Sequence, residues 1–557
     1  MRVFSRFCTG EEASPPTPEL YVEKPNGLEQ VHSEEDLFRY TKHRWLFNEE
    51  RELSKRYLKF DLQALVRVAV TACDGAHHCT RVTKCIEGLY NKAYILEMDN
   101  GSEVVAKLPN PNAGPARFTV ASEVATRELL RVLEVPVPRI LSWSCDAAGN
   151  TVGAEYIIEE KAPGVRLGSV WKQWPQKLKL QLITQVVDME ANLTSVTFDK
   201  HGCIYFKDDL LSFTGEAEEI HASAANNTLK GFAIGPLTTN ELWNATRQNI
   251  NMDRGPWKKP SDYTYAMGRN EMTWIKAHAI PRMNHARSSQ SQETPGDGLA
   301  LLEKYNSVSP YLVPPDDTSA LSVLWHPDLH LDNIFVDPDS FQITRIIDWQ
   351  SARVAPLFYQ SAVPRMCRHP KPVSEGWAVP GRPTDYETLS PEEQKRIDED
   401  VESETLHKYY EAQTAKRSST HWAVLQQRSI PILRKPVWLV TGIWENRDLF
   451  FLRDGLMQLV AHWDQLVPGV PCPVSFSKDE VELQSKEDEN INGVGQMLLM
   501  FAEQAVLPVD GMVEREDYEI ARENCRKFRD IFINLGKNDE EKELFRNLWP
   551  YQDSESI

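Results

Sequence analysis

The stretch His326-Pro-Asp-Leu-His-Leu-Asp-Asn333 and the later Ile346-Ile-Asp-Trp349 decide how this chain is interpreted. They supply a carboxylate at Asp328, a carboxamide at Asn333 and a second carboxylate at Asp348. A positioned carboxylate can accept the proton of a hydroxyl nucleophile, and carboxylate and amide oxygens are ligands that Mg²⁺ prefers. The set predicts a site for a nucleotide triphosphate with Mg²⁺, in which Asp328 is the base and Asn333 and Asp348 hold the metal.

The residues between the two motifs predict a hairpin. Two β-rich runs, Ile334-Phe-Val336 and Ile343-Thr-Arg-Ile-Ile347, flank the turn-forming Asp337-Pro-Asp-Ser340. A hairpin returns Asp348 towards Asn333, so the three side chains are expected to converge on one cation.

Two histidines in the first motif leave a second interpretation open. His326-x-Asp-x-His330 could hold zinc or iron in a hydrolase, because imidazole and carboxylate suit those metals. That site would need further ligands, and His369 and His407 occur outside any motif. We favour the interpretation in which His326 braces the loop through backbone hydrogen bonds and His330 lies beside the nucleotide phosphates.

The composition is that of a globular protein with an acidic surface. The chain has 557 residues and a formal charge of -19, from 62 Lys and Arg against 81 Asp and Glu. This balance argues against nucleic acid or anionic membranes as partners, since both need a basic surface. No run approaches about 18 consecutive apolar residues, so no transmembrane segment is expected. The 9 cysteines form no Cys-x-x-Cys pair, which favours reduced thiols. No feature predicts an oligomeric state.

Changes in apolar periodicity divide the chain into predicted segments. The first two are a disordered N-terminus and a helical extension that begins near Ser33. A small sheet lobe, a helical lobe, and an acidic segment with terminal helices follow. The bounds of these segments are 1–30, 31–78, 79–162, 163–477 and 478–557.

Within these segments, alternation and helical spacing predict individual elements. Strands are expected at 81–86, 93–98, 103–108 and 152–160, with a hairpin turn at Asp99-Asn-Gly101 and a helix over 119–134. Helices are expected at 175–195, 240–250, 299–306, 391–417, 443–465, 491–506 and 514–548. The Ser/Gln/Gly-rich residues 281–298 are expected to form a mobile loop.

Two features of the sheet lobe predict phosphate binding. Lys107 ends an apolar strand, where an ammonium is unfavourable unless an anion is near. Glu123 in the following helix is its natural partner, and the pair could hold Lys107 against the α- and β-phosphates. Backbone amides from Gly88 to Asn91, and the Asn91 side chain, could also reach phosphate oxygens. That loop has one glycine instead of three. The alternative for Lys107 is a surface lysine at the end of a strand. The alternative for Gly88 to Asn91 is a plain hairpin turn.

The segment HPDLHLDNIFV, with IIDW downstream, resembles the aminoglycoside phosphotransferase branch of the protein-kinase-like fold. Flanking stretches such as FRYTKHRWLFNEERELSKRYLKFDL and EGLYNKAYILEMDNGSEVVAKLPNPNAGP are similar to the fungal altered inheritance of mitochondria protein 9 group. The resemblance runs from about residue 37 to beyond 465. It implies an α+β, bilobal protein-kinase-like fold, with a small antiparallel-sheet N-lobe for the nucleotide and an enlarged helical C-lobe for the acceptor.

Carried over position by position, the resemblance implies a role for each candidate residue. Asp328 is similar to the catalytic aspartate, and Asn333 and Asp348 resemble the magnesium ligands. Lys107 is similar to the phosphate-binding lysine, and Glu123 to its ion-pair partner. The implied enzyme uses ATP and Mg²⁺ to phosphorylate a hydroxyl group of a small molecule whose identity the sequence does not reveal.

The resemblance implies further properties and shows departures. Backbone groups of Glu160 and Ala162 would bind adenine, because Glu159–Ala162 falls at the hinge of this family. Pro327 replaces a frequent glycine, and Trp-Gln replaces Phe-Gly after Asp348. No Ala-Pro-Glu follows, which argues against a protein substrate. The implied location is the mitochondrion, with the cytoplasm as the alternative. The sparse-glycine loop favours a competing hypothesis, a catalytically weak nucleotide-binding protein that acts in mitochondrial maintenance.

Overall fold

The computed structural model describes residues 16–222, 229–283, 292–316, 319–379, 381–445 and 449–553. The chain divides into two compact units. The first, here called the sheet unit, consists of Met1–Lys42, Arg56–Asn110 and Arg139–Lys161. The second, the helical unit, consists of His43–Lys55, Pro111–Pro138 and Ala162–Ile557. Of the helices in the described ranges, none has the length and apolar character needed to cross a membrane.

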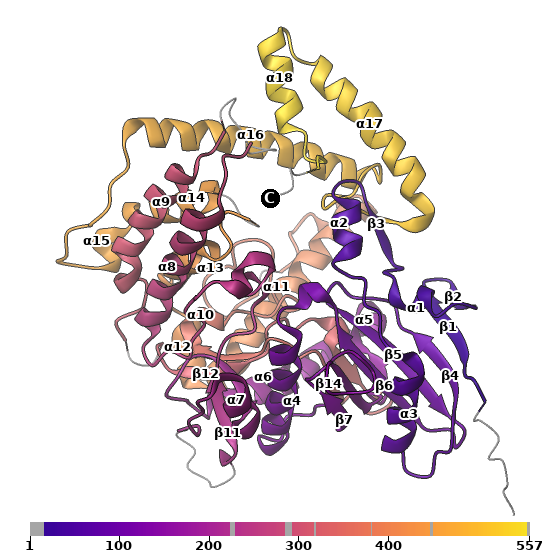
Figure 1. The fold of residues 1–557 in the computed structure, drawn as a ribbon. Coiled ribbons are helices and arrows are strands. Elements are labelled where there is room, and N and C mark those ends of the chain that lie inside the picture. The colour runs from indigo at the N-terminus through magenta and orange to yellow at the C-terminus, as the bar shows by residue number, and fades with distance from the viewer. Residues whose placement is uncertain are drawn as a thin grey trace, which may run out of the picture. The chain divides into compact units, whose positions relative to one another are not determined.

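The sheet unit is built on a seven-stranded sheet with the strand order β2-β1-β4-β5-β6-β8-β7 (Figure 1). Neighbouring strands run antiparallel, except that β1 and β4 are parallel. The elements of this unit are β1 (Glu19–Lys24), β2 (Gly27–Gln30), α1 (Glu35–Phe38), α3 (Leu62–Ala72), β4 (Cys79–Lys84), β5 (Asn91–Met98), β6 (Glu103–Pro109), β7 (Ile140–Ser144) and β8 (Tyr156–Glu160). The strands predicted from period-two alternation are confirmed as β4, β5, β6 and β8.

Alternation decides which face of each strand is buried. Every second residue of β5 from Lys92 to Met98 is buried, and the apolar ones share a core with α3. The helix α3 begins where the Asp61 side chain accepts a hydrogen bond from the N–H of Ala64 at 2.7 Å. The predicted turn between β5 and β6 is confirmed, with Gly101 at a φ of 81°. That left-handed conformation favours glycine.

The N-terminal predictions need correction. Residues 19–30, predicted to be disordered, form the β1–β2 hairpin, and β1 extends the sheet beside β4. Residues 1–15 lie outside the described residues. The predicted helical extension holds short helices, α3 and the strand β3 (His43–Trp45), which belongs to the helical unit. There β3 pairs with β16 (Met512–Glu514). Helical spacing failed here because the partner of β3 lies near the far end of the chain.

Helices make up most of the helical unit (Figure 1). They are α2 (Glu49–Ser54), α4 (Ala116–Val132), α5 (Leu167–Val170), α6 (Gln176–Thr194), α7 (Lys207–Thr214), α8 (Pro260–His278), α9 (Pro295–Val308), α10 (Leu357–Gln360), α11 (Pro391–Arg417), α12 (Ser419–Leu425), α13 (Ile430–Val440), α14 (Leu449–Ala461), α15 (Trp463–Leu466), α16 (Lys478–Glu503), α17 (Tyr518–Asn534) and α18 (Asp539–Leu548). Its short strands, besides β3 and β16, are β9 (Val165–Arg166), β10 (Cys203–Phe206), β11 (Phe232–Gly235), β12 (Ser322–Trp325), β13 (Ile334–Val336), β14 (Ile343–Ile346) and β15 (Arg353–Pro356).

Most helix predictions for this unit are confirmed. The helices expected at 119–134, 175–195, 299–306 and 391–417 are α4, α6, α9 and α11, and 514–548 contains α17 and α18. The prediction for 443–465 is confirmed from residue 449 onward by α14 and α15. The long helix α11 starts at a capping box in which the side chains of Ser390 and Glu393 satisfy each other's backbone N–H groups.

Other predictions for the helical unit are wrong or incomplete. Residues 240–250 form two short 3₁₀ helices instead of an α-helix, and α8 and α13 were not predicted. The acidic residues 478–490 do not separate two elements but begin α16, because Ser477 and Glu480 form a capping box there. The loop expected at 281–298 lies partly outside the described residues. Arg282 and Glu293 form a β-bridge within it, and the prediction is wrong for residues 295–298, which begin α9 at a capping box of Thr294 and Asp297.

Two hydrophobic cores of the helical unit hold the strands that flank the predicted site. One core contains Ile346 and Trp349, and the other contains Ile334 and Val336. The strand β13 pairs with β14 on one side and with β9 on the other. Because Ile334, Val336 and Ile346 are buried in these cores, the loops that leave the strands start from fixed points.

A buried carboxyl group joins α6 to α11. Glu190 accepts a hydrogen bond from the Tyr410 hydroxyl at 2.7 Å. Burial raises the pKa of Glu190 from 4.5 to about 8, and the bond from Tyr410 offsets this only in part. Between those two pH values the unfolded chain has released the proton that the folded chain retains. The stability that the protonated Glu190 contributes to the fold is therefore lost as the pH rises through this range.

We expect the substitution Glu190→Gln to remove this pH dependence. Between about pH 5 and 8, the unfolding free energy of the natural chain should fall relative to that of the variant by about 1.4 kcal/mol per pH unit. Urea denaturation of both proteins at three pH values measures the difference. A difference that stays constant with pH would contradict a protonated Glu190.

Candidate active site

The predicted motif lies on a loop between β12 and β13. A short 3₁₀ helix over Leu331–Asn333 leads directly into β13. The strands β13 and β14 form the predicted hairpin, with Ile334 opposite Ile346. The hairpin is therefore confirmed, and it places Asn333 and Asp348 just beyond its paired residues.

His326 braces the loop with both of its ring nitrogens. Its Nδ1 accepts a hydrogen bond from the N–H of Asp328 (3.1 Å), and its Nε2 donates to the carbonyl of Ile347 (3.0 Å). The ring meets that of Trp349 edge to face, with centroids 4.5 Å apart. Burial lowers the pKa of His326, and the bond to Ile347 and the charge of Asp348 oppose this shift only partly.

The engaged nitrogens confirm the bracing role and weaken the zinc or iron interpretation. A metal ligand needs a ring nitrogen with an available lone pair, and both nitrogens of His326 already have partners. In the described ranges, moreover, no three His, Cys, Asp or Glu side chains are grouped so that they could hold a metal.

Four hydrogen bonds join the loop and the hairpin in a closed ring. His326 makes two of them. Asn333 makes the other two: its Nδ2 donates to the carbonyl of Asp328 (3.0 Å), and its carbonyl accepts from the N–H of Ile347 (2.9 Å). Asp348 follows Ile347 directly. The ring thus brings the backbone of Asp328, Asn333 and the start of the Asp348 segment together.

The oxygens of Asn333 and Asp348 suit a hard cation. Because Nδ2 of Asn333 donates to Asp328, its Oδ1 is the atom that can face a ligand. Asp348 has a φ of 63°, a left-handed conformation that aspartate adopts more readily than most residues. One amide oxygen and one carboxylate fit Mg²⁺. Their role as metal ligands stays a prediction.

Asp328 presents its carboxylate to solvent from this fixed backbone. Its side chain is 58% exposed, and its Oδ2 lies 3.8 Å from Nε2 of His330. The Nδ1 of His330 accepts a hydrogen bond from the N–H of Asp332 at 3.2 Å. A carboxylate positioned in this way can meet a substrate hydroxyl without rearrangement of the loop. The predicted contact of His330 with phosphates stays a prediction.

Two candidate residues of the sheet unit, Lys107 and Asn91, share one face of the sheet. Lys107 pairs with Ala93 across β5 and β6. Its neighbours Ala106 and Leu108 point into the core with α3, so Lys107 points to the opposite face. Asn91 lies two residues before Ala93 and is therefore on the same face as Lys107.

Gly88 lies in the loop before β5. A Cβ atom at this position would meet no other atom within 4 Å, and the φ of Gly88 is outside the left-handed region. Among the described residues, therefore, no neighbouring atom requires glycine at this position.

The remaining candidates are divided between the two units: Glu160 belongs to the sheet unit, and Glu123 and Ala162 belong to the helical unit. Glu160 ends β8 in the sheet unit, and Ala162 begins the last segment of the helical unit. Glu123 is buried in α4, with its Oε1 3.9 Å from Nη1 of Arg127. Because Lys107 and Glu123 belong to different units, their predicted ion pair stays a prediction, as do the adenine contacts of Glu160 and Ala162.

Reasoning from the sequence missed a buried charged cluster beside the Gly88–Asn91 loop. It consists of Lys84, Glu87 and Lys92, all of them buried. The available signal was period-two alternation, which places Lys92 on the buried face of β5. A lysine there needs an anionic partner.

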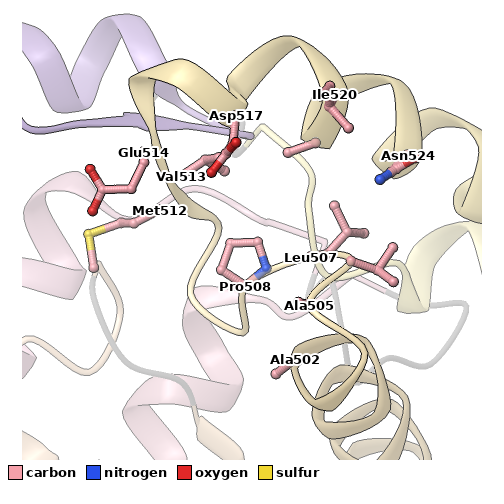
Figure 2. A pocket seen from close by; sticks show the side chains of 12 residues that line it. Ala502, Ala505, Leu507, Pro508, Met512, Val513, Glu514, Asp517, Ile520 and Asn524 are labelled. Atoms are coloured by element: carbon pink, nitrogen blue, oxygen red, sulfur yellow. The ribbon is translucent and has the colours of Figure 1, made fainter.

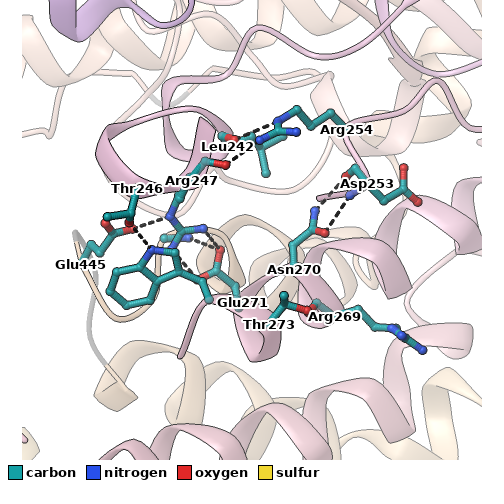
Figure 3. Close-up of polar contacts among 12 residues, drawn as sticks. Leu242, Thr246, Arg247, Asp253, Arg254, Arg269, Asn270, Glu271, Thr273 and Glu445 are labelled. Carbon is teal, nitrogen blue, oxygen red and sulfur yellow. Dashed lines mark hydrogen bonds and ion pairs between the residues drawn. The ribbon is translucent and has the colours of Figure 1, made fainter. Parts of the chain in front are cut away.

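Two further features of the helical unit contain none of the candidate residues. A hollow of about 440 Å³ lies between the end of α16, β16 and α17, and its lining includes Leu507, Val513 and Ile520 (Figure 2). A buried ion pair joins Arg247 to Glu271 (Figure 3).

Comparison with known proteins gives the family. Over 514 residues, the chain is 31% identical to a subtelomeric hrmA-associated cluster protein of Aspergillus fumigatus, which covers 86% of this chain and 98% of that protein. The chain belongs to the family of this protein. It is also 23% identical to altered inheritance of mitochondria protein 9 of Saccharomyces cerevisiae over 524 residues, 80% of this chain and 82% of that protein. The predicted family relationship is confirmed. No family model matches the sequence.

Solved structures of phosphotransferases resemble the chain more distantly. A ternary complex of APH(2")-IIa with streptomycin and ATP has a TM-score of 0.34 and 11% identity, covering 72% of this chain and 97% of that chain. The amicoumacin kinase hAmiN has a TM-score of 0.32 and 13% identity, covering 78% and 94%. The chain has an α+β fold, with a sheet unit and a larger helical unit.

Proposed function

We propose that this chain is an ATP- and Mg²⁺-dependent phosphotransferase that acts on a hydroxyl group of a small molecule. The observation that supports this function best is the ring of hydrogen bonds through His326, Asp328, Asn333 and Ile347. It fixes a solvent-facing carboxylate beside an amide oxygen and the segment that carries a second carboxylate. A hydroxyl-phosphorylating site needs these three groups.

In this proposal, Asp328 orients the acceptor hydroxyl and takes its proton. Asn333 Oδ1 and the Asp348 carboxylate would hold Mg²⁺, which when bound neutralises charge on the phosphates. The ring keeps these groups from moving during the reaction, so alignment contributes more than the weak basicity of a carboxylate. In the sheet unit, Lys107 and the Gly88–Asn91 loop would bind phosphate oxygens.

A thermal-shift series with ATP tests the metal and nucleotide site. A ligand that binds only the folded state raises the midpoint of unfolding with concentration. We expect ATP to stabilise the natural chain only when Mg²⁺ is present, and this stabilisation to disappear in Asp348→Ala. The control is Asp339→Ala, which removes an exposed carboxylate from the turn of the same hairpin. Equal shifts in both variants, or shifts that do not need Mg²⁺, would contradict the proposal.

Two observations favour a second candidate function, a nucleotide-binding protein without appreciable turnover. The loop before β5 has a single glycine, and the yeast relative is named for altered inheritance of mitochondria. A role in mitochondrial maintenance would follow, in a protein located in the mitochondrion as the names of the relatives indicate. Magnesium-dependent ATP binding, without formation of ADP in any pool of hydroxyl metabolites, would favour this candidate. Fractionation of cells tests the location.

A further inference from the structure

Both ends of the Gly88–Asn91 loop are held by one buried carboxylate. Glu87, just before the loop, receives the ammonium of Lys92, just after it, at 2.6 Å from Oε1. The ammonium of Lys84 lies 3.0 Å from Oε2 of the same carboxylate. We call these three residues the loop anchor. All three side chains are fully buried.

Burial makes the loop anchor rigid. A buried ammonium or carboxylate is stable only with its partners in place, so these side chains cannot exchange their contacts for water. Burial lowers the pKa of Lys92, and the charge of Glu87 opposes that shift. The contact between Glu87 and Lys92 therefore fixes how far apart the two ends of the loop lie.

The N-terminal segment Asp36–Thr41 completes the anchor from outside the loop. Both the N–H and the hydroxyl of Thr41 donate to Oε2 of Glu87, at 2.6 and 2.9 Å. Lys84 donates to the carbonyl of Asp36 at 3.3 Å and also to that of Arg39. The segment thus supplies four of the hydrogen bonds that the anchor makes.

Two backbone contacts restrict the loop further. The N–H of Ile86 donates to the Glu23 side chain at 3.1 Å, and the carbonyl of Tyr90 accepts from the N–H of Asn110 at 2.8 Å. Gly88 and Leu89 lie between these fixed points.

We propose that the loop anchor and the segment Asp36–Thr41 position the Gly88–Asn91 loop for the phosphates of a nucleotide. This inference rests on the proposed function. A glycine-rich loop is flexible and loses conformational entropy when it closes on a ligand. A loop whose ends are already joined loses less conformational entropy when it binds a ligand. One glycine is then sufficient in this loop, where other phosphate-binding loops have several. Glu87 and Lys92 are then positioning residues, and they do not touch the nucleotide.

The substitution Lys92→Met tests the proposal, because Glu87 keeps Lys84 and Thr41 as partners in that variant. We expect the Kd for Mg-ATP to rise about tenfold, while the Kd for adenosine, which has no phosphates, stays the same. Hydrogen exchange of the peptide that spans residues 86–92 should become faster, with little change in α3. The control is Arg81→Met, which removes a different ion pair, with Glu97, from the same sheet.

A second variant keeps the test valid if Lys92→Met does not fold. Thr41→Val removes only a hydroxyl, and we expect a smaller change of the same kind, about threefold in the Kd for Mg-ATP. If both nucleotide and adenosine bind more weakly in equal proportion, or if exchange in the loop is unchanged in Lys92→Met, the inference is wrong. If the natural chain binds no Mg-ATP, the proposed function fails, and hydrogen exchange alone still decides whether the anchor orders the loop.

Discussion

Replacing Asp328 by alanine is expected to slow phosphate transfer about 100- to 10,000-fold, the range found for general acid–base groups. Both hydrogen bonds of Asp328 within the ring use its backbone N–H and carbonyl. Alanine keeps these groups, so the loop should retain its structure and the affinity for Mg-ATP should not change. The variant therefore tests the carboxylate alone.

The rate is measured as ADP and phosphorylated product formed in pools of hydroxyl-bearing metabolites, with mass spectrometry to identify the acceptor. Asp339→Ala provides the matched control, since it removes an exposed aspartate from the nearby hairpin turn. An unchanged rate in Asp328→Ala, at normal nucleotide affinity, would exclude Asp328 as the base.

The substitution Glu271→Gln is expected to have the largest effect on stability. Glu271 accepts hydrogen bonds from Nη1 and Nη2 of Arg247 at 2.6 and 2.9 Å, and both side chains are fully buried (Figure 3). Arg247 also contacts Glu445, and its guanidinium lies 5.0 Å from the ring centroid of Trp274. Gln keeps the shape of Glu271 and removes its charge. Loss of one member of a buried ion pair destabilises a fold by about 3 to 5 kcal/mol.

Urea denaturation followed by tryptophan fluorescence measures this change, because Trp274 lies beside Arg247. The exposed pair Lys395–Glu399 provides a comparison. There Glu399→Gln should change the unfolding free energy by less than about 1 kcal/mol. If Glu271→Gln and Glu399→Gln lower the unfolding free energy by similar amounts, the Arg247–Glu271 pair does not stabilise the fold as its burial indicates.

Elements whose structure depends on residues close together in the chain could be predicted from the sequence. The hairpin between Asn333 and Asp348 was predicted correctly because a turn and two β-rich runs lie next to each other. The capping box at Ser390 and the turn at Gly101 are equally local signals. The ring of hydrogen bonds follows from that hairpin, since it closes once Asn333 and Ile347 are paired.

The predictions failed where a segment depends on a distant partner. The strand β3 forms because β16 pairs with it, and no local pattern around Trp45 shows this. Residues 240–250 have helical spacing, yet the side chain of Arg247 turns inward to Glu271. The loop anchor was missed for a similar reason. Lys92 and Glu87 are close in sequence, but Thr41, which completes their contacts, is not.

His326, which braces the loop that carries Asp328, makes the geometry of that loop tolerant of mild acid. His326 must be neutral, because its Nδ1 accepts a hydrogen bond from the Asp328 N–H. Protonation of His326 at Nδ1 would place its new N–H opposite the N–H of Asp328, so that two hydrogen-bond donors would face each other. The lowered pKa of His326 keeps the ring of the folded chain neutral below the ordinary value of 6.5. Because the unfolded chain takes up that proton from about pH 6.5 downward, the stability of the fold declines over the same range in which the folded ring stays neutral. A decline in turnover just below neutrality would thus report the titration of other groups, with the loop still intact.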